Sequence, residues 1–208
     1  MTSGKCRVAV LASGRGSNFR ALAERCQDPT FSADVACLIT DDRSAPVVAI
    51  ADAFGIPWHA VPAAERRGRL QAGAEAEIVR ICEAAGVGLV VLAGFMRILD
   101  GDLLVRYAGR IMNIHPSLLP AFKGLNAPKQ AIEYGVRIAG CTVHFVDASL
   151  DGGPVILQAA VPVRDGDDVE TLRSKIQAEE HRIVARAVDL FATGRLRVEG
   201  RRVFGADD

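Results

Sequence analysis

The sequence predicts a domain of the α/β class, with a mixed and mostly parallel sheet and helices on both of its faces. Strand-like apolar segments alternate with helical patterns along the whole chain. Half of the 208 residues are hydrophobic and 24% are charged, which suits a full core and is too apolar for a disordered chain. No repeat, low-complexity tract or linker-like stretch divides the chain, so we expect one domain over residues 1–208.

The N-terminal half, about residues 6–114, contains the segments expected to form a parallel sheet. These strands are continuously apolar or rich in β-branched residues. They are Cys6–Ala12, Asp34–Thr40, a short segment near Trp58, Gly88–Gly94 and Arg110–Ile114. Helices are expected between them: one capped by Asn18, one from about Ser44, and one over about Glu65–Ala85.

The C-terminal half, about residues 115–200, begins with a proline-bounded loop and a helix near Ala127–Tyr134. The strands Ile138–Val146 and Pro154–Val163 follow. Because only a short loop around Asp151 separates them, we expect them to pair antiparallel. Asp167, with Glu170 three residues later, resembles a capping box and opens a last helix that runs to about Phe191.

Charge, apolar length and cysteine spacing exclude several classes of protein. Lys and Arg number 25 and Asp and Glu number 25, a balance that argues against binding nucleic acid by bulk charge. The longest apolar stretch, Val87–Phe95, is far shorter than the roughly 20 residues of a membrane span. The first residues contain no apolar targeting core. The five cysteines form no metal-ligand pattern, so we expect free thiols in a reducing compartment, no metal site and a cytoplasmic enzyme.

A glycine-containing loop, residues 13–18 (SGRGSN), joins the first strand to the first helix. Ligands of α/β folds bind outside the carboxyl ends of the strands, and helix N-terminal N–H groups attract anions such as phosphate. The dinucleotide-binding pattern would need a third glycine at position 19, where the chain has Phe19. The loop is therefore either a tight turn without a ligand or a monophosphate site to which Ser17 and Asn18 add polar donors.

Three polar side chains of the chain stand out as a possible catalytic group: Asn113, His115 and Asp151. Asn113 and His115 are two residues apart at the end of a buried strand, so they share one face. An amide and an imidazolium can stabilise a developing oxyanion while a carboxylate orients the imidazole, and together they can run acyl transfer. Taken singly, His115 is more simply a hydrogen-bonded loop histidine and Asp151 a turn residue. For His144, in the middle of a strand, we expect packing with a satisfied hydrogen bond.

Four strings of the sequence resemble the phosphoribosylglycinamide formyltransferases, also called GAR transformylases. They are LASGRGSN, LAGFMRIL, MNIHPSLLPAFKGLNA and GCTVHFVDASLDGGPVILQ, and their order matches over about residues 7–195. The resemblance implies a Rossmann-like formyltransferase fold, with a nucleotide-binding-like N-terminal half and a catalytic, folate-binding C-terminal half. It also implies transfer of a formyl group from the co-substrate 10-formyltetrahydrofolate to the amine of GAR, in purine synthesis.

The resemblance assigns roles residue by residue. The catalytic positions are Asn113, His115 and Asp151. The positions that contact GAR are Gly16, Ser17 and Asn18 at the phosphate, with Gln177 and Glu180 in the last helix. The positions around the folate are Met96, Arg97, Ile98 and Leu99, with Asn113 and with Asp147, Ala148, Ser149, Leu150 and Asp151 opposite. Met96 and Leu99 could instead be plain core, and Gln177 and Glu180 a solvated helix face.

The chain departs from the family at one folate-contacting arginine. Counting without gaps from Met96 places Gln71 at that position, and Arg66, Arg67 or Arg69 could serve if the helix start has shifted. The expected partners are the two small substrates, with no nucleic acid and no membrane, and the chain acts as a monomer or homodimer. The alternatives are another enzyme that uses 10-formyltetrahydrofolate, either a deformylase or a formyltransferase for another amine, and an idle folate- or nucleotide-binding module.

Overall fold

The computed structural model describes residues 4–62 and 68–206, and it confirms the α/β class with a mixed, mostly parallel pairing of strands. The chain forms two compact units, which are described one at a time. Unit 1 comprises the residues up to Met112, and unit 2 those from Asn113 onward. Strand β5 (Ile111–His115) contains the boundary between them. That the two act as one domain stays a prediction.

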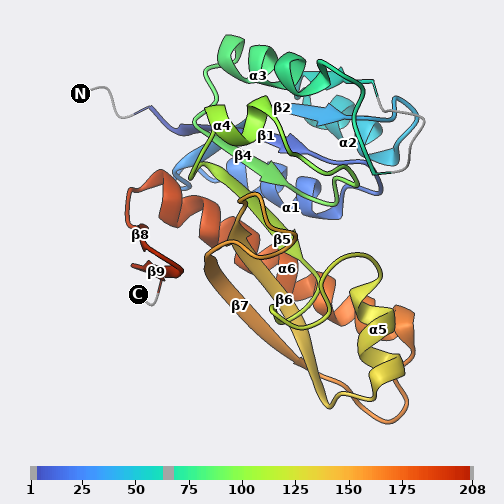
Figure 1. The fold of residues 1–208 in the computed structure, drawn as a ribbon. Coiled ribbons are helices and arrows are strands. Elements are labelled where there is room, and N and C mark those ends of the chain that lie inside the picture. Colours follow the sequence, from blue (N-terminus) through green and yellow to red (C-terminus); the bar gives the residue numbers. More distant parts are fainter. Residues whose placement is uncertain (1–3, 63–67, 207–208) are drawn as a thin grey trace. The chain divides into compact units, whose positions relative to one another are not determined.

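Unit 1 is a parallel sheet with helical crossovers (Figure 1). Its strands lie in the order β3-β2-β1-β4, and each neighbouring pair is parallel. The four strands are β1 (Cys6–Leu11), β2 (Ala33–Thr40), β3 (Trp58–Ala60) and β4 (Leu89–Leu92). The helices are α1 (Ser17–Cys26), α2 (Pro46–Phe54), α3 (Ala74–Ala84) and α4 (Asp102–Arg106). All four residues of β4 are buried, as the apolar run predicts for a covered parallel strand.

The structure corrects two predictions for unit 1 and adds one helix that was not predicted. Asn18 does not cap α1, because Gly16 occupies the N-cap position with a left-handed φ of 74° and Asn18 lies inside the helix. Helix α3 begins only at Ala74, after Gly73 with φ of 81°, so the described residues before it do not extend the helix toward Glu65. The short helix α4 follows the apolar strand β4 and was not expected from the pattern. The left-handed backbone conformations of Gly16 and Gly73 set the N-terminal ends of α1 and α3.

Unit 2 is built on an antiparallel pair covered by a long helix (Figure 1). Strands β6 (Ile138–Phe145) and β7 (Val155–Pro162) pair antiparallel, which confirms the prediction from their short connection. Helix α6 (Val169–Ala192) packs along both strands, and α5 (Ala127–Tyr134) packs against α6. Strand order in this unit continues β6-β7-β9-β8.

Two features of unit 2 differ from the expected ones. Asp168, not Asp167, caps α6, because its carboxylate accepts the Thr171 N–H at 2.8 Å. Asp167 instead binds the Lys175 ammonium and the Arg164 N–H. The short antiparallel hairpin of β8 (Arg197–Glu199) and β9 (Arg202–Phe204) was not expected, since each strand has only three residues.

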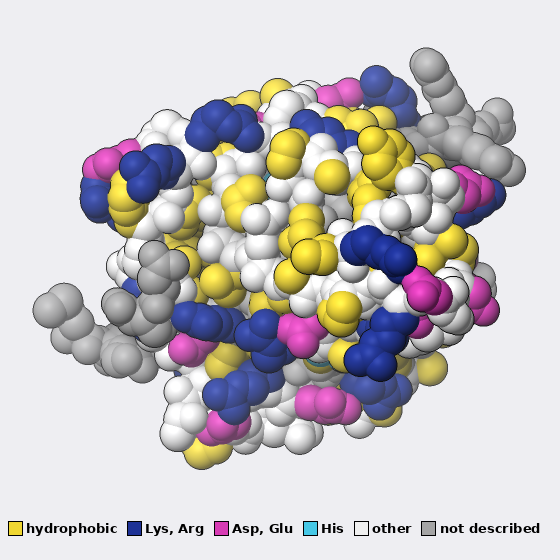
Figure 2. Space-filling view, turned by 90° about the horizontal axis from the view of Figure 1, so that it is seen from below, with side chains coloured by type: hydrophobic (Ala, Val, Ile, Leu, Met, Phe, Trp, Pro, Cys, Tyr) yellow, Lys and Arg dark blue, Asp and Glu magenta, His cyan; other side chains and the backbone are white. Residues whose placement is uncertain are grey.

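Charged side chains of both signs are interspersed on the surface, as Figure 2 shows for one face. Several of the basic groups pair with neighbouring acids, such as Arg197 with Glu199 and Arg137 with Asp165. Such exposed pairs contribute little to stability, on the order of 0–1 kcal/mol each. Among the described residues, no helix is both long enough and apolar enough to cross a bilayer.

Candidate active site

Strand β5 delivers two of the candidate residues to unit 2. Asn113 and His115 occupy alternate positions near its carboxyl end, and Ile114 between them is buried. His115 is itself 5% exposed, and Asn113 is half-buried. A polar pair on an otherwise apolar strand needs hydrogen-bond partners, and the structure supplies a different one for each residue.

Asn113 is held by His144 of β6. The Asn113 Nδ2 lies 3.2 Å from Nε2 of His144, and Nδ1 of the same ring lies 2.8 Å from the carbonyl oxygen of Phe145. A carbonyl can only accept, so Nδ1 carries the proton and neutral Nε2 accepts from the Asn113 amide. Burial lowers the pKa of His144, which keeps the ring neutral at neutral pH. The Asn113 amide is thereby fixed with one N–H on His144 and the other left to donate.

His115 has protein groups at both ring nitrogens. Its Nε2 lies 2.9 Å from the carbonyl oxygen of Phe122, so Nε2 carries a proton and donates it there. Its Nδ1 lies 3.5 Å from Oδ2 of Asp151. A protonated imidazole is stabilised by this carboxylate. To donate to a substrate instead, Nε2–H has to leave the Phe122 carbonyl.

Asp151 lies in the loop between β6 and β7, where its backbone takes a left-handed φ of 45°. A carboxylate residue tolerates this region better than most side chains do, although it is strained relative to glycine. Its Oδ2 accepts the N–H of Gly124 at 2.7 Å and faces His115. The side chain is only 12% exposed, so water screens its interaction with the imidazole weakly.

The three predicted catalytic residues therefore come together in one unit, but not as a simple triad. His115 and Asp151 meet directly, whereas Asn113 is anchored by His144. The expectation that His144 is packed and hydrogen-bonded is met, since it is 2% exposed and bonded at both nitrogens. Sequence reasoning missed its partner. The alternation of Gly140, Thr142 and His144 places two polar groups on one face of a strand, but it does not indicate which residue they contact.

The glycine-containing loop lies at the carboxyl end of β1 in unit 1. Gly16 takes a left-handed φ of 74°, and a Cβ built on it would lie 2.5 Å from Cγ2 of Val47. Any larger residue at this position is excluded by both the backbone and the packing. Helix α1 begins directly after it with no acidic residue in the first turn, so its N–H groups are suited to an anion.

The segment Met96–Leu99 follows β4 in unit 1. Met96 is 55% exposed and Ile98 is 52% exposed, which excludes the plain-core alternative for Met96. Leu99, at 7%, is core. The Met96 N–H is bonded to Oγ of Ser13, and Arg97 forms a 2.5 Å ion pair with the nearly buried carboxylate of Asp41. Exposed apolar side chains on an anchored loop are typical of a ligand-binding wall.

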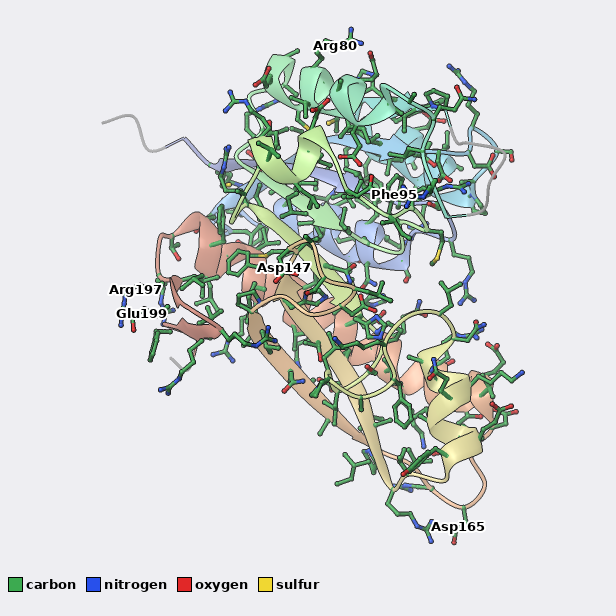
Figure 3. The ribbon with its side chains drawn as sticks, in the orientation of Figure 1. Arg80, Phe95, Asp147, Asp165, Arg197 and Glu199 are labelled. Atoms are coloured by element: carbon green, nitrogen blue, oxygen red, sulfur yellow. The ribbon has the colours of Figure 1, made fainter. Side chains whose placement is uncertain are left out.

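Residues Asp147–Leu150 form the exposed turn before Asp151, and Figure 3 shows Asp147 just beyond the end of β6. Asp147 accepts the Ser149 N–H at 2.8 Å. Desolvation raises the pKa of Asp147, but the hydrogen bonds from Ser149 and the charge of Arg201 outweigh it, and the net shift is downward. The carboxylate is thus ionised at neutral pH.

A cavity of about 400 Å³ in unit 1 is lined in part by candidates for the folate-contacting residue that the sequence left unassigned. Its lining includes Arg69, Gln71 and Ile98. Arg69 is paired with Asp100 at 2.6 Å, so its charge is already engaged. Arg66 and Arg67 lie outside the described residues. Arg69 and Gln71 are therefore the two described candidates that lie beside the exposed Ile98.

Helix α6 carries the last two predicted binding residues in unit 2. Glu180 is 8% exposed, which excludes the solvated-face alternative for this residue, and Gln177 is half-buried. Among the described residues, no group of three or more His, Cys, Asp or Glu side chains is arranged to hold a metal ion. All five cysteines are free, and burial raises the pKa of Cys82 and of Cys141 to about 12.

Known proteins resemble the chain over most of its length. The family described as formyl transferase matches residues 6–188. The phosphoribosylglycinamide formyltransferase of Bacillus subtilis (strain 168) is 42% identical over 176 residues, which are 85% of this chain and 89% of that protein. The crystal structure of glycinamide ribonucleotide transformylase 1 from Symbiobacterium toebii has a TM-score of 0.93 and 46% identity, and it covers 100% of this chain and 96% of that one.

A longer relative matches as well. The trifunctional purine biosynthetic protein adenosine-3 of Gallus gallus is 42% identical over 194 residues, which are 93% of this chain but 19% of that protein. The chain therefore spans about a fifth of the length of the trifunctional relatives that it matches.

Proposed function

Because the chain belongs to the formyl transferase family, we propose that it transfers the formyl group of 10-formyltetrahydrofolate to the amine of GAR, giving formyl-GAR and tetrahydrofolate. This is the third step of de novo purine synthesis. The observation that carries the proposal is the contact of His115 with Asp151 beside the oriented amide of Asn113. These groups match what acyl transfer to an amine requires.

The reaction needs few groups from the protein. The GAR amine attacks the formyl carbon, a C–N bond forms, and negative charge builds on the formyl oxygen. The free N–H of Asn113 donates to that oxygen, and His115 donates as well once its Nε2–H leaves the Phe122 carbonyl. As the bond to N10 breaks, the amine loses a proton and N10 gains one. Asp151, which contacts Nδ1, orients the imidazole.

We assign the substrates to the remaining residues by family position. The ribose phosphate lies at Gly16, Ser17 and Asn18, with Gln177 and Glu180 also contacting GAR. Met96, Ile98 and the turn Asp147–Leu150 hold the folate, and the exposed apolar side chains of Met96 and Ile98 support this role. We further propose that the enzyme is cytoplasmic, which the free thiols support. We also propose that it acts as a monomer or homodimer.

An assay of GAR with 10-formyltetrahydrofolate tests the proposal. We expect tetrahydrofolate and formyl-GAR to appear in equal amounts, and only when GAR is present. Release of tetrahydrofolate and formate without GAR would indicate a deformylase instead. Transfer to a different amine would indicate another formyltransferase, and binding of the folate without turnover by folded protein would indicate an idle module.

Replacing Ser17 by Ala is expected to raise the KM for GAR about tenfold or more, because a hydrogen bond to a charged phosphate contributes about 1.5–3 kcal/mol. The KM for the folate should change little. Gly16→Val is a poor test, since the added side chain would strike Val47. Ser44→Ala, which removes an exposed serine hydroxyl bonded to Asp42, is the matched control. Equal weakening of both substrates would contradict the phosphate assignment.

Activity is expected to survive prolonged treatment with EDTA. Hydrogen-bond donors suffice to stabilise the oxyanion of an activated formyl donor, so the proposed residues need no metal ion. The measurement compares kcat before and after chelation. Loss of activity that added zinc or magnesium restores would overturn this expectation.

A further inference from the structure

Strand β6 presents alternate residues to the chain segment that follows His115. Gly140, Thr142 and His144 share one face of the strand. His144 holds Asn113, as described above. The other two contact the loop Ser117–Gly124, which the mechanism has used only through its Phe122 carbonyl and Gly124 N–H.

The hydroxyl of Thr142 is fully buried, and all of its hydrogen-bonding positions have partners in the protein. It donates to the Ser117 carbonyl at 2.7 Å, and it accepts the Leu119 N–H at 3.1 Å. It also accepts an N–H of the Gln158 side-chain amide at 3.0 Å. A hydroxyl has one proton and two lone pairs, so no capacity is left over. Thr142 has an exposed fraction of 0%, which makes each lost bond costly.

Gln158 reinforces the same point of the loop. It is the cross-strand partner of Thr142 on β7, and its Nε2 also donates to the Leu119 carbonyl at 2.9 Å. Both backbone polar groups of Leu119 are therefore held by this pair. Leu118 lies against the backbone of Gly140, where a Cβ would approach its Cδ2 to 2.8 Å. The start of the loop is fixed to the sheet by three consecutive residues.

The far end of the loop returns to the candidate catalytic residues. The Phe122 carbonyl accepts from Nε2 of His115, and the Gly124 N–H donates to Oδ2 of Asp151. Phe122 and Gly124 both take left-handed backbone conformations, with φ of 50° and 79°. A shift at Leu119 is transmitted over only a few residues to both contacts.

We propose that Thr142 and Gln158 are positioning residues for formyl transfer. They hold the loop at Leu119 so that its Phe122 carbonyl and Gly124 N–H set the orientation of His115 and Asp151. This inference rests on the proposed function. It assigns to a buried threonine and a cross-strand glutamine a role that neither fulfils by touching substrate.

The test compares Thr142→Val with Thr142→Ser. Valine keeps the shape and removes the hydroxyl, while serine keeps the hydroxyl and removes the methyl. We expect Thr142→Val to lower kcat about 10- to 100-fold with both KM values little changed, since a misplacement of about 1 Å can cost about 100-fold. The alkaline limb of the pH–rate profile should move, because the loop that carries the Phe122 carbonyl and the Gly124 N–H no longer has a fixed position beside His115 and Asp151. Thr142→Ser should keep the wild-type profile.

Thr40→Val is the matched control, because it removes an equally buried hydroxyl from the end of β2 in unit 1. It is expected to lower the melting temperature and leave the alkaline limb in place. A folded Thr142→Val with wild-type kcat and profile would overturn the proposal. So would a fall in kcat that serine does not rescue and that leaves the profile unmoved, since that is the signature of a structural role alone.

A second variant and an NMR measurement test the same role of the loop. If Thr142→Val does not fold, Gln158→Met, which removes both amide bonds at similar volume, takes its place with the same expectations. The imidazole nitrogen signals of His115 in the NMR spectrum of the substrate-free protein should change in either variant and not in Thr40→Val. This readout needs no turnover, so it can fail while the proposed function holds, or succeed if GAR proves not to be the substrate.

Discussion

Replacing Asp151 by Asn is expected to lower kcat by roughly two to four orders of magnitude, the usual contribution of positioned acid–base help. The carboxylate lies 3.5 Å from Nδ1 of His115 and is only 12% exposed, so its charge acts on the ring with little screening. Asparagine keeps the shape and can still accept the Gly124 N–H, which leaves the loop in place. The difference between the two residues is therefore the charge itself.

Binding should fall far less than turnover in Asp151→Asn, because stabilising the imidazolium matters most in the transition state. The KM values of GAR and folate should each stay within about threefold. The pH–rate profile should change as well, because the carboxylate that contacts Nδ1 of His115 loses its charge. A near-normal kcat would leave Asp151 as a turn residue and the mechanism wrong.

Asp165→Asn provides the matched control for this change. Asp165 belongs to unit 2 but is highly exposed and pairs with Arg137, and Figure 3 shows it at the opposite end of the unit from Asp147. Removing its charge changes the net charge by the same amount without touching the site. We expect wild-type kcat and an unmoved pH profile, which separates a local effect of Asp151 from a general electrostatic one.

The sequence predicts the helices and strands that have a long apolar pattern. It does not predict element ends that depend on the conformation of a single residue. The run at β4 and the short connection between β6 and β7 predict a buried strand and an antiparallel pair, and both are found. Asn18 looks like a cap by composition, yet the left-handed Gly16 takes that position, because backbone freedom outweighs a side-chain bond there. A three-residue strand such as β8 has too few positions to display any period.

The candidate site divides in the same way. Spacing along β5 predicts that Asn113 and His115 share a face, since the period of a strand is a local property. It could not predict that Asn113 binds His144, because that pairing depends on how β6 lies beside the segment from Asn113 onward. Nor could it predict that Nε2 of His115 donates to the Phe122 carbonyl, since every residue type has a backbone carbonyl. A sequence motif therefore does not predict contacts that are made through backbone groups.

Replacing Asn113 by Ala is expected to lower kcat about 100- to 1,000-fold, the usual effect of removing one preorganised oxyanion donor. The side chain offers one N–H to the substrate because its other N–H is held by neutral His144. The truncation also leaves a buried acceptor on His144 without its partner, which costs about 1–3 kcal/mol of stability. A thermal melt alongside the kinetics separates the two consequences.

His144→Ala should have a smaller effect on kcat, about tenfold, because it frees the Asn113 amide to rotate without removing it. If His144 acts on the reaction only through Asn113, its removal from the Asn113→Ala enzyme should change kcat no further, and the two effects will not add. Additive losses in the double variant would show that His144 reaches the reaction by a route of its own. A kcat of Asn113→Ala within about threefold of wild type would remove the amide from the oxyanion site altogether.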